Sequence, residues 1–424
     1  MRDLLNILTA TADLKTRNEP ATLSTVVAVE GSSYRLPGAR MLIDSTGRRL
    51  GAVSGGCLEA DIARRGRLLT PQNPTSLIHY DNSDPDTAWG LGLGCNGAIK
   101  ILIEQLNPGP ADSAIKFLQT CVTHRIPGVI ATLFAGPITG RLTLTNTGAQ
   151  TSTIPDPDLH TAVLYDARQS LQSGETTTIT YETPLGPVHA LIESIHPPLP
   201  LLIFGAGHDA VPLVKYAKSL GWHVTVVDRR QSYARPDHFP QADAVIAASA
   251  EEISKKINLN KESVAVIMTH HYPDDRALLE ILLNSPVNYV GVLGPRSRTN
   301  RMLCESATIK FHPKLHAPIG LDIGADGPDQ VAISIIAEIL AHKNHRPATS
   351  LRQRTGPIHD PIKIKTTETQ RKKSRSETDH ESTRMNTNKS IPKSVFQLFV
   401  FIRADSWSLR LFTLLRASVS LWLN

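Results

Sequence analysis

Two cysteines that follow glycines are the side chains of this sequence best suited to nucleophilic or metal-binding chemistry. Cys57 ends the segment SGGC, and Cys95 lies in the segment GLGCNG. A helix expected over residues 58–69 would place the Cys57 thiol at a helix N-terminus, where the pKa of a cysteine is lowered and thiolate is favoured. The sequence leaves open the alternative that Cys57 is a small apolar residue buried behind a turn.

A second candidate site lies in residues 201–228, where an apolar run is followed by GAGHDA, a motif of the form GxGxxA. The pattern predicts a strand, a tight turn and a helix whose N-terminus favours an anion. Gly205 would allow the turn, and Gly207 would let a phosphate approach the backbone. Asp228 follows Gly207 by 21 positions, where an acid can accept hydrogen bonds from a ribose and favours NAD over NADP. The alternative is a β-α-β unit that binds nothing.

Further polar residues follow apolar runs in the same half of the chain. Thr269 and His270 come directly after the run VAVIM, and His208 lies within the glycine motif. Because open α/β sheets bind ligands at the carboxyl ends of their strands, we expect these residues at one site. His270 could transfer a proton or hydrogen-bond a ligand, or it could simply orient a loop.

The periodicity of apolar residues predicts two α/β regions with different organisation. In the N-terminal half, helices are expected at 3–17, 58–69 and 112–125, and strands at 21–30, 41–44, 49–53, 76–81, 98–104, 128–134, 177–182 and 188–193. In the C-terminal half, strands at 201–204, 223–227, 244–246, 264–268 and 289–293 alternate with helices at 211–220, 276–284, 299–305 and 330–340. Such alternation is typical of a parallel sheet with helices on its faces.

These patterns divide the chain into an N-terminal α+β domain at 1–110 and a middle segment at 111–195 that we group with it. The Pro-rich stretch HPPLP then leads into a Rossmann-like domain at 196–345. Residues 346–424 form a basic tail that we expect to be disordered, because most of it lacks large apolar residues. Its last thirty residues are apolar but interrupted by charges, so no membrane span is expected.

Composition narrows the class of protein. The chain has 424 residues, 41% of them hydrophobic, which is enough for extensive cores. Its four cysteines are widely spaced, which argues against a zinc ribbon and a disulfide scaffold. The net charge of +6 comes largely from the basic tail. The sequence of the tail indicates neither a helix that could contact base edges nor a set of aromatic side chains that could stack on bases, so nucleic-acid binding is not expected. The N-terminus does not have the pattern of a signal peptide, so we expect a cytoplasmic protein.

Several longer segments resemble the XdhC/CoxI family, accessory factors of molybdenum hydroxylases such as xanthine dehydrogenase. The matching segments are GSSYRLPGARM, SGGCLEAD, GLGCNG, FGAGHDA, VVD, MTHHYPDD, YVGVLGPRSRT and PIGLDIGADGPDQVAISIIAEI. The resemblance covers about residues 3–343. Asn96 and His271 differ from the residues that are usual at these positions in the family. These differences could alter the wall of a pocket without changing the functional class of the protein.

The resemblance implies an N-terminal XdhC domain and a C-terminal Rossmann domain that carry the molybdenum cofactor, a molybdopterin, as cargo. It implies that the protein protects the cofactor, aids its sulfuration and inserts it into an apo-hydroxylase of the xanthine dehydrogenase or CO dehydrogenase type. The protein would then be an accessory factor rather than an enzyme. A cysteine desulfurase and a second copy of the chain are further partners that this reading leaves open.

The same resemblance suggests roles for the candidate residues. Cys57 and Cys95 would contact the molybdenum, because thiolates suit soft metal centres. Arg35 and Arg40 would add positive charge for the oxyanions of the cofactor. The glycine motif and Asp228 would hold its phosphate or nucleotide end.

Two other functions are compatible with the same residues. The first is an NAD(P)-dependent oxidoreductase in which His270 acts as acid or base. The second is a nucleotide-sensing regulator that performs no chemistry and uses its basic tail to dock a partner.

Overall fold

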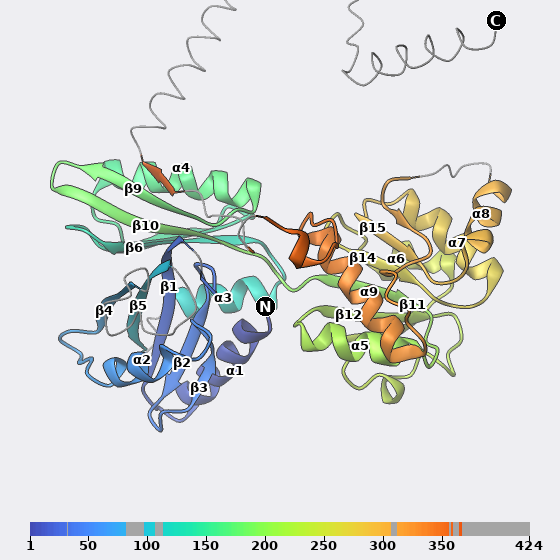
Figure 1. Ribbon diagram of the computed structural model, residues 1–424, viewed down its shortest axis with the longest axis horizontal. Coiled ribbons are helices and arrows are strands. Elements are labelled where there is room, and N and C mark those ends of the chain that lie inside the picture. The colour runs from blue at the N-terminus through green and yellow to red at the C-terminus, as the bar shows by residue number, and fades with distance from the viewer. Residues whose placement is uncertain are drawn as a thin grey trace, which may run out of the picture. The chain divides into compact units, whose positions relative to one another are not determined.

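The computed structural model describes residues 1–31, 33–81, 97–106, 113–306, 312–355, 358 and 364–366 (Figure 1). All of them belong to the unit Met1–Thr369. Cys95 lies outside the described residues, as does the apolar end of the tail at 395–424. Within the described part of the chain, none of the helices is long and apolar enough to cross a membrane.

The N-terminal region begins with a five-stranded antiparallel sheet of order β3-β2-β1-β5-β4. Its elements are α1 (Arg2–Thr16), β1 (Ala21–Gly31), β2 (Arg40–Asp44), β3 (Arg49–Gly51), α2 (Glu59–Gly66), β4 (Thr75–Asp81) and β5 (Gly97–Leu106). The central strand β1 is buried from Ala21 to Ala28 on both of its faces. The strand is therefore covered on both faces, and its buried residues include Thr22, Ser24 and Thr25 as well as apolar ones.

A second sheet follows, with the strand order β17-β9-β10-β6-β7-β8. Its elements are α3 (Ser113–Thr123), β6 (Gly128–Ala135), β7 (Gly140–Thr145), β8 (Gln150–Ser152), α4 (Pro157–Ser173), β9 (Thr177–Thr183), β10 (Gly186–Ile195) and β17 (Ile364–Thr366). Local signals set the limits of α4. The Asp156 side chain accepts a hydrogen bond from the Leu159 N–H at its start, and Gly174 adopts a φ of 72° at its end.

These two sheets, which are antiparallel apart from the β17–β9 pair, contact each other through buried side chains. Val27, Leu102, Phe134 and Leu191 belong to one apolar cluster that contains residues of both sheets. The Thr178 hydroxyl donates a hydrogen bond to the Val27 carbonyl at 3.3 Å. Residues 111–195 therefore share a core with residues 1–110, while the boundaries at 110 and 195 stay predictions.

The C-terminal region is a six-stranded parallel sheet of order β13-β12-β11-β14-β15-β16, as expected for a Rossmann-like domain. Its strands are β11 (Pro200–Phe204), β12 (His223–Asp228), β13 (Ala244–Ala247), β14 (Val264–Ile267), β15 (Tyr289–Val292) and β16 (Leu315–His316). Its helices are α5 (Ala210–Ser219), α6 (Ile253–Lys256), α7 (Tyr272–Leu283), α8 (Arg296–Glu305) and α9 (Pro328–Lys343), with 3-10 turns at Pro236–His238, Ala250–Glu252 and Leu351–Gln353.

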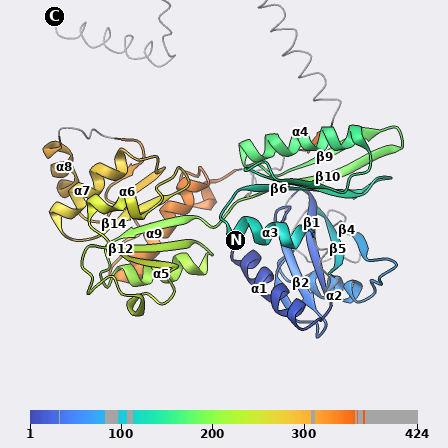
Figure 2. The same cartoon turned by 180° about the vertical axis from the view of Figure 1, so that it is seen from behind.

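Helices cover both faces of this parallel sheet (Figures 1 and 2). Leu201 and Ile203 of β11 belong to the cluster that includes residues of α5 and α9. Leu202 and Phe204 point to the opposite face and pack with residues of α6 and α7. Alternate residues of one strand are thus buried on opposite faces, which explains its unbroken apolar sequence. The strand order reverses between β11 and β14, and this is the position where such sheets hold ligands.

Two helices begin three or four residues earlier than expected. Helix α7 begins at Tyr272 rather than 276, so Asp274 and Asp275 lie in its first turn and not before it. Helix α8 begins at Arg296 rather than 299. Proline explains the first difference, because Pro273 is well suited to the first turn of a helix, where its missing N–H has no partner to lose.

The tail also contains one strand that composition did not indicate. Residues Ile364–Thr366 form β17 and pair in parallel with Thr178–Thr180 of β9. This part of the segment expected to be disordered is therefore ordered against a sheet edge. The alternating sequence IKIKT at 362–366 is a strand signal that the high charge of the tail concealed.

Candidate functional site

An open pocket lies at the carboxyl ends of β11, β12 and β14. Its polar lining residues are Asp228, Arg229, Arg230, Thr269, His271 and Asp274. Phe204, Ile253 and Leu278 contribute to its apolar wall. A concave site with an apolar wall and a few convergent polar groups is typical of small-molecule binding.

The glycine motif joins β11 to α5 next to this pocket. Gly205 has a φ of +124°, and a Cβ atom there would lie 2.3 Å from the carbonyl oxygen of Met268. Only glycine fits, because the end of β11 passes directly against the chain that leaves β14. At Gly207, a Cβ atom would lie 2.7 Å from Oδ1 of Asp209. The motif therefore forms the tight strand-to-helix turn that its spacing predicts.

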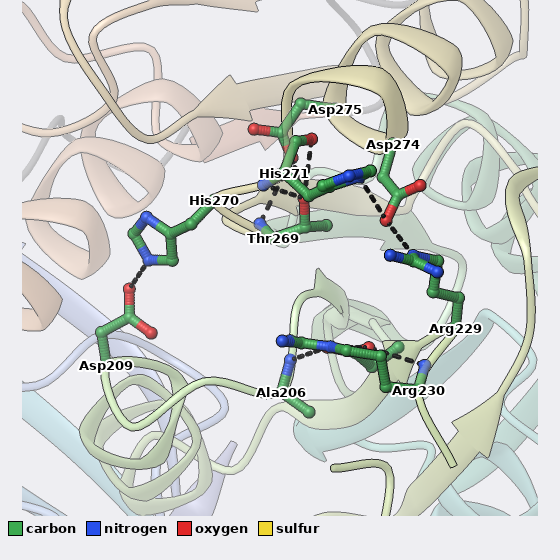
Figure 3. Close-up of polar contacts among 10 residues, drawn as sticks. Ala206, Asp209, Arg229, Arg230, Thr269, His270, His271, Asp274 and Asp275 are labelled. Carbon is green, nitrogen blue, oxygen red and sulfur yellow. Dashed lines mark hydrogen bonds and ion pairs between the residues drawn. The ribbon is translucent and has the colours of Figure 1, made fainter. Parts of the chain in front are cut away.

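Asp228 ends β12 and is only 4% exposed. It accepts four hydrogen bonds, from the Ala206 N–H at 2.9 Å, from the Arg230 N–H at 2.9 Å, and from Arg230 Nε and Nη2 at 2.9 and 2.8 Å. Figure 3 labels the two donor residues, Ala206 and Arg230. Burial opposes ionisation, but the hydrogen bonds from Arg230 and Ala206 outweigh it and lower the pKa of Asp228. The carboxylate expected to accept a ribose hydroxyl is therefore already held by Arg230.

A second group of charges lies across the pocket, at the start of α7. Arg229 Nε donates to Oδ2 of Asp274 at 2.5 Å, and His271 Nδ1 lies 3.1 Å from the same oxygen (Figure 3). Both carboxylates that line the pocket are thus paired with a guanidinium. Neither faces the cavity as an unpaired negative charge.

Thr269 is positioned by a buried acid. Asp275 is fully buried, and its Oδ1 accepts hydrogen bonds from the Thr269 N–H at 3.3 Å and from the Thr269 hydroxyl. Its Oδ2 accepts from Arg298 Nη1 in the first turn of α8. This network fixes the loop after β14 against two helices, because a buried carboxylate is stable only when its oxygens are satisfied.

His270 connects this loop to the glycine motif. Its Nε2 lies 2.7 Å from Oδ2 of Asp209, and its ring is 62% exposed (Figure 3). Its φ of +58° is unusual for a residue with a side chain and marks a backbone conformation that surrounding contacts must hold. His208 is exposed in the same motif. Neither histidine lines the pocket, although both lie in the loops that surround the switch point.

In the N-terminal region, Cys57 is exposed, which excludes the alternative of a buried cysteine. Its Sγ lies 3.6 Å from Oγ of Ser54. Ser54 also accepts hydrogen bonds from the Gly56 and Leu58 N–H groups and donates to Glu59 at 2.6 Å. Cys57 therefore precedes α2 by two residues in a turn that Ser54 and Glu59 stabilise. Cys95 lies outside the described residues, so a pairing of the two thiols stays a prediction.

Arg35 and Arg40, which were predicted to add positive charge for the oxyanions of the cofactor, both have protein partners. Arg35 Nη2 forms an ion pair with Oδ2 of Asp3 in α1 at 2.8 Å. Arg40 is 9% exposed, and its Nη1 donates to Oε1 of Glu193 in β10 at 2.7 Å. Arg40 thus stabilises the contact between the two antiparallel sheets, and its guanidinium does not lie on an open surface.

Four polar lining residues of the pocket were not among the predicted ligand-binding residues: Arg229, Arg230, His271 and Asp274. Two of them carry a local signal, because they follow Asp228 directly in the sequence VVDRR. An arginine at this position of a Rossmann fold is associated with a phosphate on the ribose. The role of Asp274 depends on the true start of α7, which the sequence pattern placed four residues too late.

Comparisons with known proteins agree with this architecture. Residues 201–339 match the family described as the XdhC Rossmann domain, and residues 14–81 match the XdhC and CoxI family. A protein of Bacillus subtilis, named as a probable xanthine dehydrogenase subunit, is 35% identical over 325 residues, which cover 76% of this chain and 93% of that protein. The molybdenum cofactor insertion chaperone PaoD of Escherichia coli is 33% identical over 87 residues, covering 20% of this chain and 26% of that protein.

A solved structure shares most of the fold. The crystal structure described as a xanthine dehydrogenase from Bacillus halodurans superposes with a TM-score of 0.68 at 28% identity, and the match covers 82% of this chain and 98% of that chain. The segments that match the two family descriptions include both the glycine motif and the SGGC turn. This chain therefore belongs to the XdhC and CoxI family.

Proposed function

We propose that this protein is an accessory factor that binds the molybdenum cofactor and delivers it to an apo-hydroxylase of the xanthine dehydrogenase type. The names of two relatives support this role, since one is a molybdenum cofactor insertion chaperone and the other a probable subunit of xanthine dehydrogenase. The observation that carries the proposal is the combination of an exposed thiol in the SGGC turn with a pocket lined by guanidinium groups. In this proposal the protein acts as a carrier in the cytoplasm. Its further expected partners are a cysteine desulfurase, which would supply sulfur, and a second copy of the chain.

The donor chemistry fits such a cargo. The Cys57 thiol is exposed at the end of a glycine-rich turn and can approach a soft metal centre. Arg229 and Arg230 line the Rossmann pocket and can donate charge-assisted hydrogen bonds to a phosphate. In this proposal Cys57, together with Cys95, binds the molybdenum end, and the Rossmann domain binds the phosphate or nucleotide end.

The test compares cysteine variants produced in a host that makes the cofactor. We expect Cys57→Ala and Cys95→Ala to retain at least about tenfold less cofactor than the wild type, because loss of a thiolate ligand weakens metal binding. Cys304→Ala is the matched control, since Cys304 is also exposed but lies in α8. Molybdenum and pterin are measured by mass spectrometry and fluorescence after purification. Unchanged retention in both variants would contradict the thiol contact, and absence of cofactor from the wild-type protein would contradict the function.

One observation favours a second candidate, an NAD(P)-dependent oxidoreductase. His270 is paired with Asp209, and its exposed ring lies at the switch point of the sheet. A histidine oriented by a carboxylate is a common acid–base arrangement. Hydride transfer to or from a nicotinamide, lost in His270→Ala, would support this function over that of a carrier.

A further inference from the structure

The pocket of the Rossmann domain combines an apolar wall with guanidinium groups rather than with an open carboxylate. We infer that it takes a nucleotide whose ribose carries a phosphate and discriminates against a nucleotide with a free ribose diol. This inference rests on the proposed function only in taking the pocket as a nucleotide-type site.

The first step concerns the acceptor that a free ribose diol would need. In a Rossmann domain that binds such a diol, the acid at the end of the second strand accepts its hydrogen bonds. Here Asp228 already accepts two hydrogen bonds on each of its oxygens, three of the four from Arg230. To reach Asp228, a diol would have to displace the charge-assisted hydrogen bonds that Arg230 donates to this nearly buried carboxylate. The two hydroxyls would replace only part of the hydrogen-bond energy that is lost.

The second step concerns the donors that Arg230 presents. Its Nε and Nη2 donate to Asp228, and within the described residues Nη1 has no hydrogen-bond partner. Its guanidinium carbon lies 3.8 Å from the centroid of the Tyr233 ring, so stacking holds the group in place. A guanidinium has five N–H donors in a planar fork, so those that Asp228 does not use can bind a phosphate.

The third step concerns the surrounding charges. Arg229 uses its Nε for Asp274, which His271 also approaches at 3.1 Å. The remaining N–H groups of Arg229 can donate to the same phosphate, since Arg229 and Arg230 line one pocket. The wall contributed by Phe204, Ile253 and Leu278 suits a planar base. The pocket thus offers two guanidinium groups for a phosphate beside an apolar surface for a base.

The experiment compares isomeric ligands on the full-length protein freed of bound small molecules. Adenosine 2′,5′-bisphosphate and ADP have the same atoms and differ in whether the second phosphate lies on the ribose or on the first phosphate. We expect the 2′,5′ isomer to bind at least about tenfold more tightly by calorimetry, a difference of about 1.4 kcal/mol. Equal affinity, tighter binding of ADP, or no measurable binding of either isomer would overturn the inference.

Two variants locate the effect. Arg230→Ala should reduce the preference for the 2′,5′ isomer to less than about twofold, because a phosphate then loses the N–H donors of Arg230 that Asp228 does not use. Arg235→Ala is the matched control, because Arg235 is an exposed arginine paired with Asp237 and does not line the pocket. It should keep the full preference. A preference that survives in Arg230→Ala, with thermal unfolding unchanged, would also overturn the inference.

The two proposals fail separately. If the wild type retains molybdenum cofactor but shows no preference between the isomers, only the inference about the ribose phosphate fails. If the preference is present but no molybdenum cofactor is ever retained, the proposed carrier function fails and the nucleotide site stands.

Discussion

At the scale of single residues, the role of an acidic side chain depends on its hydrogen-bond partners. Asp228 has the spacing of a ribose-binding acid, yet its carboxylate is held by Arg230 and the Ala206 N–H. Asp275 has no such spacing, yet it positions Thr269 and binds Arg298. Residue type and spacing identified loops that line the pocket, while the hydrogen bonds determine which charged groups face it.

Asp61 of α2 provides a measurable case of the same effect. Burial raises its pKa, but hydrogen bonds from Arg64, Arg65 and Tyr80 outweigh this and lower the pKa to about 2 from an ordinary value of 3.8. The folded pKa is below the unfolded one, so the stabilisation is complete above about pH 4 and is lost as the pH falls toward 2.

We therefore expect Asp61→Asn to lower the free energy of unfolding at pH 7 by about 2 kcal/mol, and this difference from the wild type to shrink below pH 4. Urea unfolding at several pH values measures it. The control is Asp158→Asn, an exposed acid in the first turn of α4, which should stay within about 0.5 kcal/mol of the wild type. A deficit of Asp61→Asn that is the same at pH 7 and pH 2.5 would contradict this reasoning.

At the scale of elements, one buried ion pair joins the two antiparallel sheets. Arg40 at the start of β2 donates to both carboxylate oxygens of Glu193 in β10, and its Nη1 also donates to the Gly38 carbonyl at 2.9 Å. Both side chains are 9% exposed. A carboxylate left without its partner in such a place is strongly destabilised, because it has lost its hydration as well.

Arg40→Met should lower the free energy of unfolding by about 3 to 5 kcal/mol, since it leaves Glu193 buried without a counter-charge. The double variant Arg40→Met/Glu193→Leu should recover at least half of the loss, because no buried charge then remains. Chemical denaturation of the three proteins measures both values. If the free energy of unfolding of Arg40→Met lay within about 1 kcal/mol of the wild-type value, Arg40 and Glu193 would not depend on each other as a buried ion pair.

At the scale of the whole molecule, a segment that follows the Rossmann domain in the sequence belongs to a sheet of the N-terminal region. Residues Ile364–Thr366 follow the Rossmann domain in sequence but add a strand to the edge of the second antiparallel sheet, next to β9. An edge strand covered in this way no longer offers its backbone groups to other chains. Strand β17 therefore lies in the segment after residue 345 that the sequence analysis expected to be disordered.

Two truncations test the contribution of this strand. A chain that ends after Thr369 retains β17, and we expect the amides of residues 178–180 to exchange as slowly as in the full chain. A chain that ends after Thr355 lacks β17, and exchange at these amides should be several-fold to about tenfold faster, because each lost hydrogen bond is worth about 1 kcal/mol. Hydrogen exchange read by mass spectrometry measures both. Identical protection in the two truncated chains would show that β17 does not pair with β9 in solution.

The sequence by itself determined the features that depend on neighbouring residues. The alternation of apolar runs and helical periods specified the parallel domain, because burial on both faces requires it. The GAGHDA motif specified the turn after β11, because only glycine tolerates the conformation of Gly205. The resemblance of several long segments then indicated the family, which the comparisons confirmed.

Tertiary structure alone decided which polar groups contact each other. Arg40 and Glu193 are 153 positions apart, and Thr178 and Val27 are 151 apart, so no local pattern could pair them. Arg230 is only two positions from Asp228, but its side chain could equally have pointed to solvent, and the packing on Tyr233 holds it over the carboxylate. Local sequence sets backbone conformation through short-range sterics, whereas the partner of a flexible charged side chain is set by what the rest of the fold brings within reach.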